Sequence, residues 1–408
     1  MGEFALPRKS YLELKYNGFD ASDEFASESF SYTDSASGEA DTISLTVNNQ
    51  TGKWINGFMP NAGDFIDARL CVENWNGDGD NRSIACGQFE IDSFGASAYP
   101  STVSIEGISI PIRTDFNVTT KNKDFSDTTV RDILTGICRD AGIELVYEAT
   151  NYSIAETEQT GQTDMAFAFE MCQDYNLALK LYNRKMVVYD QTDYERKAAA
   201  YTIYAADMES YSYQRANTNL YDSVQIQYTN PDNDETLTYS YQVPGSEGKR
   251  TLYINEQVDS YRDAEIRAKS RLLENLRGAV SLSVRVKGDV RHMAARNVNI
   301  SGLGKLDGTY FIDRVTHNKN AKGAYTCTLK MHLCVTHTTF TDASAEVNEN
   351  STFAGTIHPV KIGDCLWALA RYYYGSGSKY MLIYNANRDI IKDPSLIYPG
   401  QQLKIPAE

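Results

Sequence analysis

Apolar and polar side chains alternate in short runs over residues 9–113. A period of two predicts half-buried β-strands, because successive side chains of a strand point to opposite faces. The turn WNGDGDN supplies glycine and Asn/Asp residues that accept positive φ, so we predict a hairpin over residues 66–92. The stretch is typical of a β-barrel or sandwich, and its clearest positions are Ile43, Leu45 and Val47, then Phe65, Ile66, Ala68, Leu70 and Val72.

Residues 114–198 have a mixed pattern that predicts a small α+β unit. The segment SDTTVRDILTGICRDAG begins with a Ser/Asp cap and ends with Gly142, which predicts a helix over residues 126–141. Between these ends, apolar residues recur at helical spacing: Val130, Ile133, Leu134 and Ile137.

Two further elements are expected in this unit. The segment DMAFAFEMCQDYN predicts a second helix, capped by Thr163 or Asp164. The segment LALKLYNRKMVVYD predicts two strands that turn at Asn183 and Arg184.

Strand patterns return over residues 199–337, in YTIYA, SYSYQR, DSVQIQYTN and ETLTYSYQV. Tyrosine occupies alternate positions in several of them, which suits a half-exposed surface or an interface. One long helix is predicted over residues 259–279, before the strand SLSVRVKGD. Its imperfect apolar stripe consists of Ala264, Ile266, Ala268, Leu272, Leu273 and Leu276.

The last two segments differ from everything before them. Residues 338–355 carry few apolar groups and no periodicity, which predicts a flexible linker from which the last segment can swing. Over residues 356–408, Gly363 and Asp364 are predicted to end a strand and cap a helix, and Ser378 to cap a second helix. The first helix is indicated by Leu366, Leu369, Ala370 and Tyr373, and a turn at Pro399 and Gly400 precedes a strand able to pair with the first.

The text HPVKIGDCLWALARYYYGSGSKYMLIYNANRDIIKDPSLIYPGQQLKIP resembles a LysM domain over its full length. That resemblance implies a βααβ fold and the binding of N-acetylglucosamine polymers such as peptidoglycan. It places the glycan groove between the loop after the first strand and the loop before the last. The implied contacts are Gly363, Asp364, Cys365, Leu366, Ile390, Ile391, Pro394, Leu396 and Ile397.

Two departures from the LysM pattern favour a second role for this module. Cys365 stands where a hydroxyl residue is usual, and Met381 and Leu382 are apolar where exposed polar residues are expected. An added apolar patch indicates a protein partner. Glycan binding and protein docking through Met381 and Leu382 therefore both stay open.

The longer body resembles the hub proteins of phage tails and contractile injection systems, the late control protein D group, over roughly residues 115–335. The matching stretches are, in order, SDTTVRDILTGICRDAGI, DMAFAFEMCQDYNLALKLYNRKMVVYD, DAEIRAKSRLLENLRG and LGKLDGTYFIDRVTHNKNAKGAYTCTLKMHL. The resemblance implies a mainly β fold with α+β parts: two tube-like β-barrels with the α+β unit inserted between them. The implied domains are residues 1–113, 114–198 and 199–337, followed by the linker 338–355 and the LysM domain 356–408.

Composition and charge narrow the class of protein. The net charge is −15, and residues 355–408 hold six basic and four acidic side chains, which leaves about −17 on the rest. Such a body should repel nucleic acid, so sequence-specific binding is not expected. No basic start with an apolar run and no 18-residue apolar window occurs, so we expect neither secretion nor membrane insertion.

Cysteine and histidine chemistry adds no cofactor. The seven cysteines form neither a disulfide framework nor a CxxC pair, so buried, reduced thiols are expected. A group of His and Cys residues lies within 21 positions without structural zinc spacing, so we expect packing roles and no metal; it contains His317, Cys327, His332, Cys334 and His337. No GxSxG-like signature is present, so no enzyme is predicted.

These observations favour a virion structural protein: a homotrimeric baseplate hub of a phage, or of a phage-like bacteriocin, assembled in the bacterial cytoplasm. Its expected partners are the spike, the tail tube, the tape measure protein and baseplate wedge components, with peptidoglycan as a further ligand of the LysM module. The alternative is a peptidoglycan-binding cell-surface or spore-coat protein.

Overall fold

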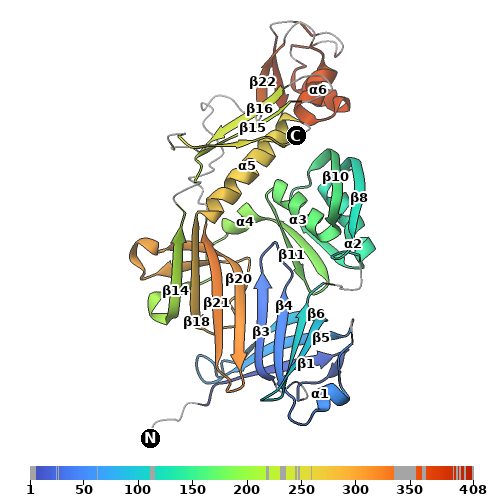
Figure 1. Ribbon diagram of the computed structural model, residues 1–408. Helices are drawn as coiled ribbons and strands as arrows, with labels where there is room; N and C mark the ends of the chain where they lie inside the picture. The colour runs from blue at the N-terminus through green and yellow to red at the C-terminus, as the bar shows by residue number, and fades with distance from the viewer. Residues whose placement is uncertain are drawn as a thin grey trace.

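The computed structural model shows four packed parts (Figure 1). The largest is a curved sheet, beside which lies the α+β unit; helix α5 leads from the sheet to a small three-stranded sheet, and the C-terminal module lies at the far end. The structure describes residues 6–23, 25, 27–61, 63–110, 115–216, 220–229, 236–243, 246, 249–258, 260–334, 355–360, 364–388, 390, 391, 394, 397, 398 and 401–406.

One sheet of 13 strands contains the strands predicted over residues 9–113 and part of those predicted over residues 199–337. The prediction of a single barrel over 199–337 is corrected by the structure, because DSVQIQYTN and ETLTYSYQV pair with each other in a separate small sheet. The main path of the 13-stranded sheet runs β14-β18-β21-β20-β3-β4-β7-β6-β5-β1-β2. Off this path, β19 pairs with β20 on one side and with β13 on the other. The strands are β1 (Lys9–Tyr16), β2 (Phe19–Asp20), β3 (Ser27–Ser35), β4 (Thr42–Asn48), β5 (Phe65–Glu73), β6 (Arg82–Ser97), β7 (Thr102–Ile108), β13 (Thr202–Tyr204), β14 (Met208–Arg215), β18 (Val280–Lys287), β19 (Asn297–Ser301), β20 (Gly308–Asn320) and β21 (Tyr325–Leu333). Short helical turns lie between strands: α1 (Lys53–Asn56), η1 (Ala205–Asp207) and η2 (Gly304–Leu306).

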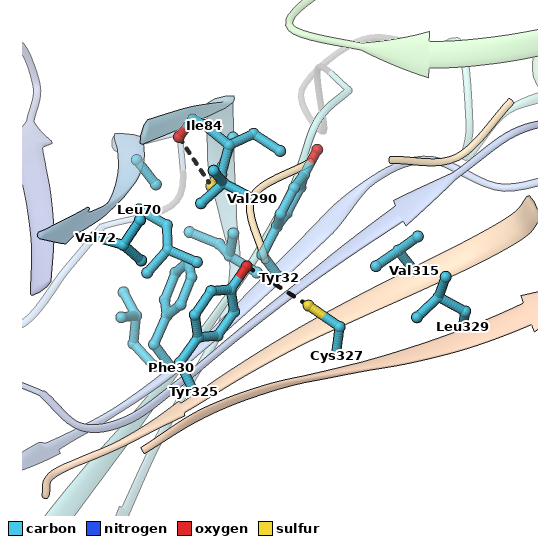
Figure 2. Packing of buried hydrophobic residues seen from close by; sticks show 14 of the residues in the cluster. Phe30, Tyr32, Leu70, Val72, Ile84, Val290, Val315, Tyr325, Cys327 and Leu329 are labelled. Carbon is cyan, nitrogen blue, oxygen red and sulfur yellow. Dashed lines mark hydrogen bonds between the residues drawn. The ribbon is translucent and has the colours of Figure 1, made fainter. Parts of the chain in front are cut away.

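The two halves of this sheet are joined where β3 pairs antiparallel with β20, from Ser35 opposite Arg314 to Ser29 opposite Asn320. The strand alternation predicts the inward side correctly, because Ile43, Leu45 and Val47 are all buried. Side chains from both halves share one core (Figure 2), in which Phe30 and Tyr32 of β3 lie with Leu329 of β21. The predicted hairpin is confirmed as β5 and β6.

Over its described residues, the α+β unit contains three helices and two small sheets. Its helices are α2 (Val130–Ala141), α3 (Asp164–Asp174) and α4 (Gln191–Glu195), and its strands are β8 (Thr120–Thr129), β9 (Glu144–Glu148), β10 (Ser153–Thr163), β11 (Leu177–Tyr182) and β12 (Lys185–Asp190). The predicted turn between β11 and β12 is confirmed, since Asn183 and Arg184 both have positive φ. The predicted Ser/Asp cap of α2 is wrong: Ser126 lies in β8, and the Thr129 side chain accepts from the Asp132 amide. A β-strand runs up to the cap because β10 pairs with β8 along its length.

The third part consists of β15 (Ser223–Thr229), β16 (Thr236–Gln242) and β17 (Thr251–Ile254), covered by α5 (Tyr261–Gly278). The imperfect apolar stripe of α5 has a structural reason, since the helix faces two neighbours. Ala264, Ala268 and Leu272 are buried against the small sheet, whereas Ile266 packs against the core of the α+β unit. Helix α5 therefore connects the small sheet to the α+β unit.

The C-terminal module has a βααβ order: β22 (Gly355–Pro359), α6 (Leu366–Tyr374), η3 (Gly377–Lys379), α7 (Tyr380–Ala386) and β23 (Gln402–Pro406). The first and last strands pair antiparallel, as predicted. Two predicted caps are wrong. Cys365, not Asp364, caps α6, because its sulfur accepts a hydrogen bond from the Ala368 amide. Helix α7 follows η3 directly and has no side-chain cap. The Ser378 hydroxyl bonds to Ser376 and does not cap α7.

Several predictions fall on residues that the structure does not describe. The linker 338–355 lies almost entirely outside the described residues, as do Gly363, Leu396, Pro399 and Gly400. All seven cysteines are free thiols, and all except Cys365 are buried. Within the described part of the chain, no helix combines the length and apolarity needed to cross a bilayer.

Candidate functional site: the C-terminal module, its contact with the body, and the open sheet edge

A buried asparagine holds the C-terminal module together. The Asn387 side chain is fully buried at the end of α7. Its amide nitrogen donates to the carbonyls of Ile383 (2.7 Å) and Lys404 (2.6 Å), and its oxygen accepts from the Lys404 amide (2.7 Å). A buried amide satisfied in this way fixes α7 against β23, because the hydrogen bonds have no competing water.

The predicted glycan contacts divide into inward and outward side chains. Leu366 and Ile391 are buried and share the module core with the half-buried Ile397, so the structure brings the two predicted segments together on the inside. Cys365 and Ile390 are exposed, and Asp364 and Pro394 are half-buried. The outward residues could contact a ligand, whereas Leu366 and Ile391 have their side chains in the core.

A histidine connects the Asp364 loop to α6. Nε2 of His358, on β22, lies 2.8 Å from Oδ2 of Asp364, and Nδ1 lies 3.0 Å from the hydroxyl of Tyr373. A neutral imidazole has one donor and one acceptor nitrogen. When Nε2 donates to the Asp364 carboxylate, Nδ1 therefore accepts a hydrogen bond from the Tyr373 hydroxyl.

Large apolar side chains are concentrated on the surface of this module. Met381 and Leu382 are 39% and 40% exposed, which agrees with their proposed place on the outside of α7. Trp367 is 56% exposed and lies flat against Gly377, where a Cβ atom would come within 2.3 Å of the indole ring. Exposed apolar groups gathered on a small module suit a binding surface.

Three tyrosines make the contact between this module and the body. Tyr261, the first residue of α5, has its ring centroid 6.5 Å from that of Tyr372 and 6.2 Å from that of Tyr373. The Tyr372 and Tyr373 rings are themselves 4.8 Å apart, edge to face. We call these three residues the tyrosine clasp. Although the module was predicted to swing, the structure places it against α5.

At its other end, α5 is tied to α4 and β21 by charged side chains. Arg277 donates through Nε to Glu195 (2.5 Å) and through Nη1 to Asn176 (2.7 Å). His332 has Nδ1 2.7 Å from Asp313 and Nε2 3.4 Å from Glu195. Burial alone would lower the pKa of His332, but the two carboxylates outweigh it and raise the pKa to about 9. His332 is therefore a buried cation at neutral pH.

The remaining members of the predicted His/Cys group have separate partners. Nδ1 of His317 lies 2.6 Å from the Tyr325 hydroxyl and 3.3 Å from the Cys327 sulfur, all in the main core. Burial lowers the pKa of His317 to about 4, so this imidazole is neutral. Cys334 donates to Asn297, and His337 lies outside the described residues. Among the described residues, no group of His, Cys, Asp or Glu has an arrangement that could hold a metal.

Lys180 fastens the α+β unit to the main sheet. From β11 its ammonium group donates to Asp34, to Asp41 (3.2 Å) and to the Ser35 carbonyl (2.7 Å). Burial alone would lower the pKa of Lys180, but the two carboxylates raise it, so the lysine stays charged. Sequence reasoning missed Lys180, Tyr261 and His358, because a single polar residue in a strand or at a helix start has no local signature.

The main sheet ends on β14, whose described pairing partner is β18 alone. Six of its eight residues are exposed, and Tyr211 is 53% exposed. An eight-residue edge strand offers backbone N–H and C=O groups to another strand, and natural proteins usually cover such edges. We call β14 the open edge.

The C-terminal module matches the model of the LysM domain family over residues 358–406. This chain is 44% identical over 55 residues to the potassium binding protein Kbp of Escherichia coli, and 45% identical over 52 residues to an uncharacterized protein of Deinococcus radiodurans. These matches cover 14% and 13% of this chain, and this chain spans only 37% and 20% of the length of those two proteins.

The fold of the body is that of phage tail proteins. A tail protein from Neisseria meningitidis superposes with a TM-score of 0.60 at 14% identity, over 79% of this chain and 96% of that chain. The 43 kDa tail protein of prophage MuSo2 from Shewanella oneidensis gives 0.56 at 12% identity, over 79% and 97%. A type VI secretion system component of E. coli gives 0.50 at 12% identity, over 80% and 78%.

Proposed function

We propose that this chain is the structural hub of a contractile tail or injection apparatus, in which three copies form a ring between the tail tube and the spike. The tail-protein fold of the body supports this proposal. The observation that carries it is the open edge, since a closed ring needs a surface on each copy that fits the next one.

The chemistry of the open edge suits strand pairing between subunits. Tyr211 presents a large exposed ring with a polar tip, as interfaces often do, whereas Tyr213 on the same face packs against the main core. The charge on this strand is limited, with Glu209 already paired to Arg285 at 2.8 Å. Strand addition at such an edge gains backbone hydrogen bonds that water otherwise satisfies.

In this role the protein acts by geometry and not by catalysis. The ring would contact the tube on one side and the spike on the other, enclose the exit channel of the tape measure protein, and meet wedge components at its rim. The net charge of −15 supports a passage that polyanions such as DNA cross without adhering. The location that follows is the baseplate of a virion or of a DNA-free particle.

The LysM module has two candidate partners in the assembled baseplate. The exposed Met381 and Leu382 favour docking to another baseplate protein. The match to the LysM family favours peptidoglycan, which the tip meets when it crosses the cell wall. Asp364, Cys365, Ile390, Pro394 and Ile397 would line the glycan site, together with Gly363 and Leu396.

Light scattering of the purified full chain tests the ring. We expect a particle of three times the 45.7 kDa chain mass. Tyr211→Lys places a charge on the open edge, and we expect it to give monomers. Tyr253→Lys is the matched control, because Tyr253 is 74% exposed on β17, away from the edge. A wild-type monomer, or a trimer that survives Tyr211→Lys, would contradict the assignment of this edge.

Co-sedimentation separates the two roles of the module. Peptidoglycan binding predicts that the full chain sediments with purified sacculi and that Ile390→Asp abolishes this. Protein docking predicts instead that Met381→Asp with Leu382→Asp removes the chain from assembled baseplates and leaves sedimentation unchanged. Each result favours one partner and counts against the other.

A further inference from the structure

The tyrosine clasp is a small contact between two parts of one chain. It joins the first residue of α5 to the last turn of α6, where Gly375 also lies close to Ser260, the residue that caps α5. A few aromatic contacts contribute only about 0.5–1.5 kcal/mol each beyond their buried area. Because the module is covalently connected to the body, effective concentrations on the order of millimolar help so small a contact to form.

The clasp is connected to the Asp364 loop by one side chain. His358 lies between Asp364 and Tyr373, and its ring is edge to face with the Tyr373 ring at 5.8 Å. The side chains of His358 and Asp364 are 15% and 23% exposed, so the hydrogen bond between them is largely shielded from water. The Asp364 carboxylate keeps the imidazole proton of His358 on Nε2. Nδ1 is then free of a proton and can accept a hydrogen bond from Tyr373.

We propose that His358 couples the Asp364 loop to the tyrosine clasp, so that a ligand that takes the Asp364 carboxylate loosens the module from α5. This inference rests on the proposed ligand role of the Asp364 loop. A ligand hydroxyl or amide that draws Oδ2 of Asp364 away from Nε2 of His358 removes the acceptor that orients the imidazole. Tyr373 then loses its own acceptor, and the aromatic contact with Tyr261 weakens.

The device gives the module two positions with different uses. Docked on α5, the module is held at a defined place in the ring. Released, it can follow a bound partner or wall polymer. Coupling is reciprocal, so a weaker clasp must also raise affinity at the Asp364 loop by the same factor.

Hydrogen exchange of the full chain, measured without ligand, tests the coupling. The readout is the exchange rate of amides at the start of α5, residues 260–264. Tyr261→Ala removes the clasp directly and therefore gives the largest increase in exchange rate that loss of the clasp can cause. Tyr253→Ala is the control and should leave the exchange of residues 260–264 unchanged. We expect His358→Phe to raise exchange about threefold to tenfold, the range for loss of a single hydrogen bond.

A double-mutant cycle decides whether the signal passes through His358 and Tyr373. Asp364→Ala should raise exchange at residues 260–264 in the wild-type background and have no further effect in Tyr373→Phe, which keeps the ring but lacks the hydroxyl. Additive effects, or no effect of Asp364→Ala, would overturn the coupling. Exchange of β23 should stay slow in every variant, because it is held by Asn387; fast exchange there would mean general unfolding of the module, and that result also counts against the proposal.

An N-acetylglucosamine hexamer separates this proposal from the proposed function. A hexamer that binds and raises exchange at residues 260–264 supports both. A hexamer that binds and leaves exchange unchanged overturns the coupling alone. If the hexamer does not bind, the glycan role fails, while the ligand-free cycle still decides the coupling.

Discussion

The ammonium nitrogen of Lys180 lies 3.2 Å from Oδ1 of Asp41, and this contact joins the α+β unit to the main sheet. Asp41 also accepts from the Ser35 amide and from the Tyr32 hydroxyl, so its carboxylate lies at the centre of a buried network. Burial raises the pKa of Asp41, and the nearby Lys180 opposes that rise. The orientation of the α+β unit thus depends on one cation placed between two carboxylates.

Lys180→Met should leave Asp34 and Asp41 buried without their cation. Removal of one partner of a buried ion pair costs about 3–5 kcal/mol, and we expect a loss of that size in urea unfolding. Lys185→Met is the matched control, because Lys185 pairs with Glu144 on the surface, where both side chains are at least 40% exposed. If both variants lost the same unfolding free energy, the buried network would contribute no more to stability than the surface ion pair.

His332 should make the stability of the body depend on pH above neutrality. Its pKa is about 9 in the folded chain, against 6.5 as the ordinary value. A raised pKa of a base contributes stability that is fully present below pH 6.5 and is lost as the pH rises through 9. The difference between these two pKa values corresponds to about 3 kcal/mol of unfolding free energy.

Urea unfolding at pH 6 and pH 9.5 measures this loss. In His332→Gln the same comparison should show a much smaller decrease, because the titrating group is gone. A wild-type protein equally stable at both pH values would contradict the buried cation.

Asn387→Ala should loosen the C-terminal module. The substitution leaves the carbonyls of Ile383 and Lys404 and the Lys404 amide without their buried partner. Unsatisfied buried groups cost about 1–3 kcal/mol each, so faster hydrogen exchange in β23 is expected. Asn385→Ala is the control, because Asn385 is exposed on α7 and bonds only to Arg388 among the contacts that the structure describes.

Two glycine substitutions should have opposite effects on unfolding. A Cβ at Gly288 would lie 2.3 Å from the Tyr325 ring, in the core that closes around Trp75. Overpacking of this kind costs about 1–3 kcal/mol, so Gly288→Ala should lower the melting temperature. Gly136 lies inside α2 with open space around its Cβ position, and Gly136→Ala should stabilise by about 0.5–1 kcal/mol. Calorimetry of both variants checks the pair.

Local patterns in the sequence predicted most elements, and the reasons are visible in particular residues. The alternation at Ile43, Leu45 and Val47 depends only on strand geometry, and the φ preference of Asn183 and Arg184 is a property of the turn itself. Helix starts were less certain. At α2 the pairing of β8 with β10 moved the cap from Ser126 to Thr129, and at α6 Cys365 took the place predicted for Asp364.

The sequence by itself determined many of the strands, though not β8, β9 or β10, together with the main helices, the βααβ order of the C-terminal module and its likeness to LysM domains, because each follows from residues close together in the chain. Only the tertiary structure decided that β3 and β20 join the two halves into one sheet, that β14 is left as its edge, and that Lys180 meets Asp41. It also decided that Tyr261 meets Tyr373 across more than a hundred residues. Contacts of this kind depend on how faces and edges meet in space, and a single chain position carries no periodic signal for its distant partner.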